Sequence, residues 1–292
     1  MVNKKIVYLP CLDSYEMALA RQKVLDIPRQ VARELGESAV EAITLGKYQV
    51  TGKEIYVDWS GQVRNAYNKK ISISPLAGLP EFNADDFFET RIQVTNETTL
   101  LATKRIIDKG FNPLVLNLAN GVNPGGGFLN GARAQEESIC RSSALYQTLL
   151  GDTMYEEHRK RHLPDSTDWA IYSPEVPVFR TDNGITLEQP WLMNVLTCAA
   201  PYAPTVGRVE AARLLRKRIH RVLSIAQAYG YSSLVLGAWG CGAFGNDPKQ
   251  TAKDFRSAFE SEFSGAFSDI IFAITDWSPE RKFLGPFKDV LS

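Results

Sequence analysis

The sequence has few of the residues that mark metal-binding, redox and disulfide-rich proteins. Among 292 residues there are only three histidines and four cysteines. The cysteines are widely scattered and form no CxxC pair, so we expect free thiols. His158 and His162 have the i, i+4 spacing of a helical metal site, but their neighbours are uniformly charged and no third ligand accompanies them. We therefore expect a solvated surface there, with no metal and no cofactor.

The sequence also lacks a charge excess and a long apolar run. Basic and acidic residues number 33 each, so no overall field would hold nucleic acid or an anionic membrane. No stretch approaches the roughly 18 apolar residues of a membrane span. The first residues, MVNKKIVYLPCLDSYE, reach acidic side chains too early for a secretory signal. These absences predict a soluble monomer without membrane contact, cytoplasmic or, in a eukaryotic source, also nuclear.

The hydrophobic residues, 44% of the chain, are arranged as alternating strands and helices. Such a pattern predicts an α/β sandwich with both sheet faces covered. In the helix predicted over 205–229, Val209, Leu215 and Ile219 belong to the inner stripe and Arg218 to the outer faces. Those outer faces are interpreted as solvated surface, or as a track for polymer phosphates. Residues 13–36 are predicted to form a kinked helix or two helices, broken at Pro28. The other predicted elements are strands around turns at Gly52 and Gly61, a strand at 91–95, a helix to Gly110, strands at 113–118, 169–180 and 191–202, a strand at 233–238, a helix from Pro248, and a strand at 269–276.

One stretch combines a glycine run with two acids at the start of a helix. The strand at 113–118 is followed by Asn123-Pro124, which ends regular structure, and then by the GGG run at 125–127. Glycine backbone can bring several N–H groups against an anion such as a phosphate. Seven residues later, QEE at 135–137 opens a helix predicted to run to about Leu150. Helix capping alone would explain the acids, but the entropic cost of three glycines favours a phosphate cradle beside a proton-transferring carboxylate.

A second glycine loop follows the strand at 233–238. Residues 240–245, GCGAFG, spell the GxGxxG fingerprint of dinucleotide-binding folds. The context excludes that fold, because the next strand-end acid, Asp276, lies well beyond the usual spacing of about 20 residues and too little chain remains. We instead expect a second anion site near a helix N-terminus, with Phe244 offering a face for a base or a ribose.

These strings together resemble the poly(ADP-ribose) glycohydrolases (PARGs), in particular the compact microbial type. The family signature is GGG, a spacer of six to eight residues, and QEE; the segment YSPEVPVFR at 172–180 and the GCGAF string also match. The resemblance implies a macrodomain-like three-layer sandwich with a mixed central sheet and ligand loops at one edge. Residues 1–88 would form an N-terminal accessory segment packed on a catalytic core at 89–292.

The resemblance also implies a reaction. The substrate would be poly(ADP-ribose), or a macromolecule carrying it, and hydrolysis of the ribose–ribose O-glycosidic bond would release ADP-ribose. Exo action is expected, although the residues themselves do not separate it from endo action. Glu137, the second glutamate of QEE, would be the catalytic acid, and Glu136 would bind ribose hydroxyls.

The remaining site residues follow from the same resemblance. Glu97 is interpreted first as helix capping and second as an adenine-binding residue. Two other functions stay open: a module that binds ADP-ribose without turnover, and a hydrolase that removes single ADP-ribose groups from DNA or protein. The other expected ligand-binding residues are Asn120, Asn123, Gly125, Gly126, Gly127, Gln135, Gly240, Cys241, Gly242, Ala243 and Phe244.

Overall fold

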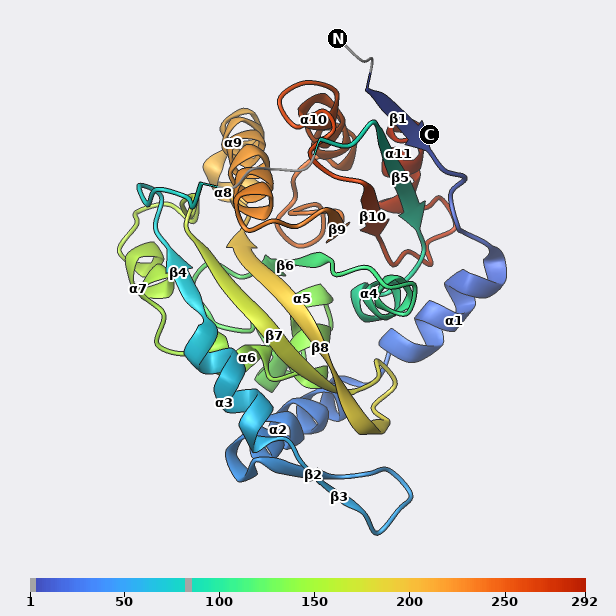
Figure 1. The fold of residues 1–292 in the computed structure, drawn as a ribbon, viewed down its shortest axis with the longest axis vertical. Coiled ribbons are helices and arrows are strands. Elements are labelled where there is room, and N and C mark those ends of the chain that lie inside the picture. The colour runs from blue at the N-terminus through green and yellow to red at the C-terminus, as the bar shows by residue number, and fades with distance from the viewer. Residues whose placement is uncertain (1–3, 82–85) are drawn as a thin grey trace.

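The structure, a computed structural model, describes residues 4–81 and 86–292. In that part of the chain eight strands form one mixed sheet in the order β1-β5-β10-β9-β6-β8-β7-β4 (Figure 1). The strands from β1 to β8 in this order are parallel; β7 pairs antiparallel with β8, and β4 pairs antiparallel with β7. The strands are β1 (Lys5–Tyr8), β4 (Ile71–Ile73), β5 (Glu89–Thr95), β6 (Leu114–Ala119), β7 (Ala170–Arg180), β8 (Thr186–Ala199), β9 (Ser233–Leu236) and β10 (Asp269–Ala273).

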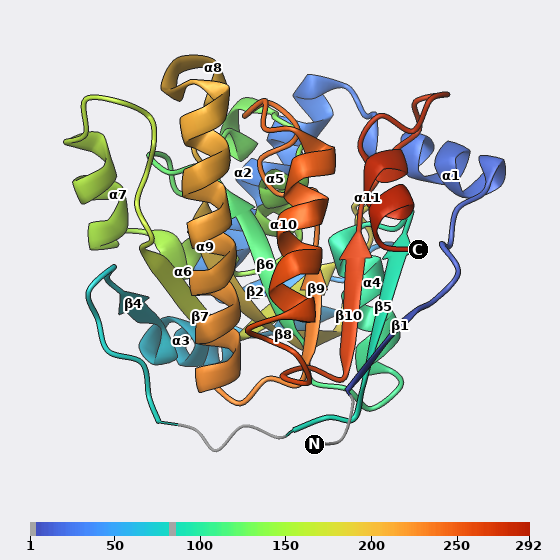
Figure 2. The same cartoon turned by 90° about the horizontal axis from the view of Figure 1, so that it is seen from above.

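Helices cover both faces of this sheet, as predicted. On one face the strands pack against α9 (Arg208–Ala228), α10 (Pro248–Glu260) and α11 (Leu284–Val290). On the other face they pack against α4 (Thr99–Ile107), α5 (Gln135–Ser142) and α6 (Leu145–Leu149). Figure 2 shows α9, α10 and α11 standing together in front of the strands. The result is the expected three-layer α/β sandwich with a mixed sheet.

The N-terminal residues supply both edges of the central sheet. β1 pairs in parallel with β5, and β4 pairs antiparallel with β7 (Figure 1). This segment also holds α1 (Tyr15–Leu25), α2 (Arg29–Leu45) and the small hairpin β2 (Lys47–Gln49) and β3 (Tyr56–Asp58). The expected accessory segment therefore completes the core sheet as well as packing on it.

Helix α2 supports the loop that follows β6. Arg29 donates from Nε to the carbonyl of Asn130 at 2.7 Å, and a Cβ on Gly36 would lie 2.8 Å from the carbonyl oxygen of Phe128. Phe128 begins the 3₁₀ turn η1 (Phe128–Asn130), which lies between the GGG run and α5. The N-terminal segment thus packs against this loop through α2.

Three predicted elements differ in the structure. Gly61 lies inside the helix α3 (Ser60–Lys69) and not in a turn. The single helix predicted from QEE to about Leu150 is divided into α5 and α6, because Ser143 is extended and bridges to Val178 of β7. The helix predicted over 205–229 is interrupted at Gly207, where φ is 91°, leaving the short α8 (Ala203–Val206) before α9.

The predicted inner stripe of α9 is wrong at two positions. Val209 is 88% exposed, because α9 begins at Arg208 and its first turn extends past the sheet. Arg218 is instead buried, and its guanidinium donates to the carbonyl oxygens of Ala199 and Asp165. A buried arginine that binds the last carbonyl of β8 and a carbonyl of the α7–β7 segment occupies the face that composition alone assigned to solvent.

The polar segment around the two histidines is also more structured than expected. His158 lies on α7 (Thr153–Arg159) and is buried, whereas His162 follows the helix and is exposed. The prediction of a solvated surface is therefore wrong for His158. Within 4–81 and 86–292 no three His, Cys, Asp or Glu side chains are grouped to hold a metal ion. No helix there is long and apolar enough to span a bilayer.

Candidate active site

A cavity of about 450 Å³ lies where the parallel strands of the sheet end. Each of the strands β5, β6, β9 and β10 is followed within two positions by a residue that lines the cavity. These residues are, in the same order, Glu97, Asn120, Ala238 and Ile274. Because carboxyl ends of parallel strands meet at one edge of a sheet, this is the usual place for a ligand in an open α/β fold. The cavity holds residues from both predicted loops, including Asn120, Glu136, Glu137, Gly240, Gly242, Ala243 and Phe244.

Both carboxyl oxygens of Glu136 are held by protein donors. Oε2 accepts the backbone N–H of Asn120 at 2.7 Å, and Oε1 accepts Nδ2 of Asn117 at 3.3 Å. The pKa of Glu136 is raised to about 8, mainly by complete burial and also by the neighbouring Glu137, while the hydrogen bonds from Asn120 and Asn117 act in the opposite direction. Glu136 is therefore a fixed, protonated carboxyl group at neutral pH.

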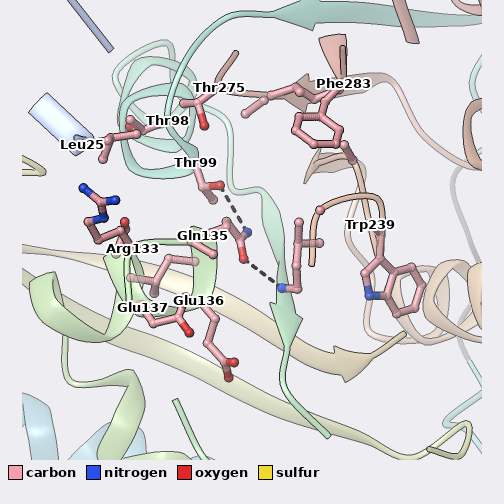
Figure 3. Close-up of a pocket in the computed structure, with 18 of the residues that line it drawn as sticks. Leu25, Thr98, Thr99, Arg133, Gln135, Glu136, Glu137, Trp239, Thr275 and Phe283 are labelled. Carbon is pink, nitrogen blue, oxygen red and sulfur yellow. Dashed lines mark hydrogen bonds between the residues drawn. The ribbon is translucent and has the colours of Figure 1, made fainter. Parts of the chain in front are cut away.

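Glu137 has one engaged and one unengaged oxygen. Oε1 accepts the backbone N–H of Gly127 at 2.9 Å. Oε2 is buried and has no hydrogen-bond partner among the described residues. Figure 3 shows both glutamate side chains extending from the first turn of α5. Since an unpaired buried carboxyl oxygen costs free energy, this atom is the one available to a substrate.

The GGG run holds these carboxyl groups and does not present a row of free amides. Gly126 donates its N–H to the carbonyl of Asn123 at 3.0 Å, and the N–H of Gly127 binds Glu137. None of the three glycines lines the cavity. The amides of Gly126 and Gly127 are thus engaged within the protein, and their expected contact with a phosphate stays a prediction. Their lack of a side chain leaves room for the acids.

Gln135 is engaged by the protein on both amide atoms. Its Oε1 accepts the N–H of Leu118 at 2.8 Å, and its Nε2 donates to the carbonyl of Leu116 at 2.7 Å and to Thr99 at 3.2 Å (Figure 3). β9 pairs with β6 only at Leu114 and Val115, so the glutamine amide takes the place of a strand partner beyond them. Its polar groups bind β6 and not the cavity.

The second glycine loop has the free amides that the first lacks. Among the described residues no partner is found for the backbone N–H groups of Gly242, Ala243 and Phe244, which line the cavity. Phe244 is half-buried and packs edge-to-face on Tyr202, with ring centroids 5.8 Å apart. This loop is the better anion site.

Cys241 differs from its neighbours in the loop. Its N–H binds the carbonyl of Ala238, and its thiol is buried against Thr251, where burial raises the thiol pKa to about 12. It does not line the cavity. Cys241 therefore anchors the loop to α10, and its expected ligand contact stays a prediction.

Of the polar residues expected at the ligand, Asn120 and Glu97 line the cavity and Asn123 does not. Asn120 accepts the N–H groups of Val122 and Asn123 on Oδ1, each at 2.9 Å, and lines the cavity, whereas Asn123 is exposed outside it. Glu97 also lines the cavity and receives two hydrogen bonds from Arg105, at 3.0 and 2.6 Å. The residue that caps α4 is Thr98 and not Glu97.

Several lining residues were not predicted from the sequence. Thr275 and Phe283 follow β10, and Trp239 precedes the second loop (Figure 3). Asp182 comes from the β7–β8 turn and accepts a hydrogen bond from Thr98 at 2.5 Å. The position of Thr275 just after a parallel strand was a usable signal. Nothing in the sequence indicates that the hairpin turn reaches α4.

The family model of the microbial-type PARG catalytic domain matches residues 36–181. The chain belongs to this family. It is accordingly an enzyme of the glycosidase class and a poly(ADP-ribose) glycohydrolase, with the macrodomain-like fold seen in the family's solved structures. A comparison with curated proteins gives no match.

Solved structures of PARGs agree with the family assignment. The enzyme from Thermomonospora curvata is 37% identical over 89% of this chain and 99% of its own, with a TM-score of 0.83. Its complex with the inhibitor ADP-HPD gives a TM-score of 0.81 at 37% identity over the same shares. The enzyme from Deinococcus radiodurans, solved in complex with ADP-ribose, is 34% identical over 84% of this chain and 98% of its own, with a TM-score of 0.71.

Proposed function

We propose that the chain removes terminal ADP-ribose units from poly(ADP-ribose), with Glu137 as the catalytic acid. The observation that carries this assignment is the buried, unpartnered Oε2 of Glu137, a residue that lines the cavity. Both oxygens of Glu136 are already held, so only Glu137 has an atom placed to exchange a proton with a ligand. The D. radiodurans relative was solved with ADP-ribose, which supports this class of ligand.

The proton balance follows from these contacts. Glu137 gives its proton to the departing ribose oxygen as the bond from the anomeric carbon to that oxygen breaks. It then takes a proton from the water that bonds to the anomeric carbon, so the acid is restored. Glu136, protonated and fixed, binds the ribose hydroxyls. The substrate's own diphosphate, and no second protein carboxylate, orients the attacking water.

The second loop and the adjacent side chains bind the nucleotide. The free N–H groups of Gly242, Ala243 and Phe244 receive the diphosphate, and the Phe244 ring packs on a ribose or base. Asn120 lies beside the distal ribose, and Glu97 contacts adenine. A cavity of about 450 Å³ accommodates one nucleotide sugar, which supports action at a terminal unit.

A monomer is the proposed solution state. The most exposed large apolar side chains, Tyr15, Leu76 and Val209, belong to different parts of the fold. Light scattering during size-exclusion chromatography would test this. The cytoplasmic location stays a prediction.

Incubation of the purified chain with defined poly(ADP-ribose) tests the function. Chromatography should show free ADP-ribose from the first time points, while long polymer shortens gradually. Glu137→Gln should lower kcat by about 10²–10⁴-fold, the usual contribution of a general acid, and still bind ADP-ribose. The exposed Glu156 on α7 offers a matched control, Glu156→Gln.

Other outcomes would contradict separate parts of the proposal. Binding of ADP-ribose without any turnover would identify a binding module. Release of single ADP-ribose groups from protein or DNA, with polymer left intact, would identify the alternative hydrolase. Full activity of a folded Glu137→Gln variant would refute the catalytic assignment.

A further inference from the structure

His158 connects α7 to the loop that carries Asn120. Its Nδ1 lies 2.9 Å from the carbonyl oxygen of Gly121, and its Nε2 lies 2.7 Å from Oγ1 of Thr167. His158 is buried, with 4% of the residue exposed, and it does not line the cavity. A histidine with both nitrogens engaged in this way is held in one orientation.

The contacts define the tautomer of the neutral ring. Thr167 donates its backbone N–H to Nε2 at 3.1 Å, so Nε2 is an acceptor. The single proton of a neutral imidazole is then on Nδ1, which donates to the Gly121 carbonyl. His158 therefore accepts from one segment and donates to another.

The Gly121 carbonyl is adjacent to a bond that holds an active-site carboxyl. The next residue back, Asn120, donates its N–H to Oε2 of Glu136 at 2.7 Å. The space around Gly121 is also filled, since a Cβ there would lie 2.3 Å from Oγ of Ser166 and 3.3 Å from Nδ1 of His158. Gly121 cannot shift toward α7, and its carbonyl is fixed by the imidazole.

Resting on the proposed function, we propose that neutral His158 is a positioning residue that fixes the Asn120 amide on Glu136, and that its protonation weakens catalysis at acidic pH. A proton added at Nε2 would face the N–H of Thr167, and two donors repel. The segment from Ser166 would then separate from the ring, and the ring, which still donates from Nδ1, would carry the Gly121 carbonyl out of its present position.

The surroundings of the ring oppose protonation. Burial is the largest effect and lowers the pKa of His158 below 6.5. The hydrogen bond to the Gly121 carbonyl acts in the opposite direction, as does Asp165, while Arg218 from α9 and Arg161 lower this pKa further. The buried Tyr155 lies one turn earlier on α7. The neutral ring is thus the form present at pH 7, and its loss is expected as the pH falls below 6.5.

Three variants test the proposal through kcat, KM and pH profiles on defined polymer. His158→Phe fills the space without either hydrogen bond and should lower kcat about tenfold at pH 7.5, with KM changed less than threefold. His158→Gln can donate from its NH₂ to Gly121 and accept from Thr167, but it does not titrate. It should keep most of the neutral-pH activity and lose less of it than the wild type between pH 6.5 and 5. His162→Gln, at the exposed histidine, should match the wild type.

The outcomes separate this proposal from the proposed function. A wild-type kcat for folded His158→Phe, or an acid limb in His158→Gln equal to that of the wild type, would overturn it. If His158→Phe does not fold, the pH profile of His158→Gln alone decides. Absence of turnover in the wild type would refute the proposed function, and the effect on the loop would then be read from the calorimetric affinity for ADP-ribose across the same pH range.

Discussion

Gly126 lies so close to the carboxyl group of Glu137 that a side chain at position 126 would displace that carboxyl. A Cβ there would lie 2.3 Å from Oε1 of Glu137 and 3.0 Å from Oε2 of Glu136. The backbone at Gly126 also has φ of 61°, in the left-handed region. Because Gly126 has no side chain, the carboxyl groups of Glu136 and Glu137 can occupy the space beside it.

Gly126→Ala should displace the Glu137 carboxyl and lower kcat at least tenfold in a folded protein. Kinetics on defined polymer, with circular dichroism to confirm folding, would measure this. Gly52→Ala is a matched control, because Gly52 has φ of 74° and nothing within 4 Å of its Cβ position. Both variants should lose about 1–2 kcal/mol of stability from the strained backbone, but only Gly126→Ala should lose activity. Equal activities would refute the steric role.

Glu136→Gln should make thermal stability less dependent on pH. The folded state holds the carboxyl proton up to a pKa of about 8, whereas the unfolded chain loses it near 4.5. The stabilising contribution of this group is complete below pH 4.5 and is lost as pH rises through about 8. Tm of the variant minus Tm of the wild type should therefore increase between pH 5 and 8, by about 5 °C or more.

Differential scanning calorimetry at several pH values would check this difference. For the control Glu41→Gln, at an exposed position on α2, the Tm difference from the wild type should not change with pH. A constant difference for Glu136→Gln as well would mean that this carboxyl group does not retain its proton in the folded enzyme.

Sequence patterns predicted the elements of this site better than their contacts. Buried strands followed by glycine loops predicted that Glu137 and Phe244 share one cavity, since parallel strands end at the same edge. The direction of each amide could not be predicted, because the Gly127 N–H could face a ligand or Glu137 with the same local sequence. His158 was assigned to solvent for a similar reason, as its partners Gly121 and Thr167 become neighbours only in the tertiary structure.

Gln135→Leu should destabilise the fold with a smaller effect on the chemistry. The change leaves the N–H of Leu118 and the carbonyl of Leu116 without partners beside a buried strand. Each unsatisfied group costs about 1–3 kcal/mol, so the free energy of unfolding should fall by about 2–6 kcal/mol for the two groups. Urea unfolding would measure this. Gln147→Leu on α6 is the control, since Gln147 makes no side-chain hydrogen bond within the described residues. A loss of less than 1 kcal/mol would exclude the strand-partner role.

Phe244→Ala should weaken ADP-ribose binding without reducing the rate at saturation. The ring lines the cavity and is supported from the side by Tyr202, so its face is held toward the ligand. Loss of one such stacking contact costs about 1–3 kcal/mol, which predicts a Kd raised about 5- to 100-fold. Because Phe244 lies in the loop after β9 while the acids are on α5, kcat should change less than threefold. Calorimetry with ADP-ribose and kinetics on polymer separate the two effects.

Phe88→Ala, at an exposed phenylalanine before β5, should leave both Kd and kcat unchanged. An unchanged Kd in Phe244→Ala would place the nucleotide elsewhere in the cavity, and a large loss of kcat would mean that this loop also orients the reacting bond.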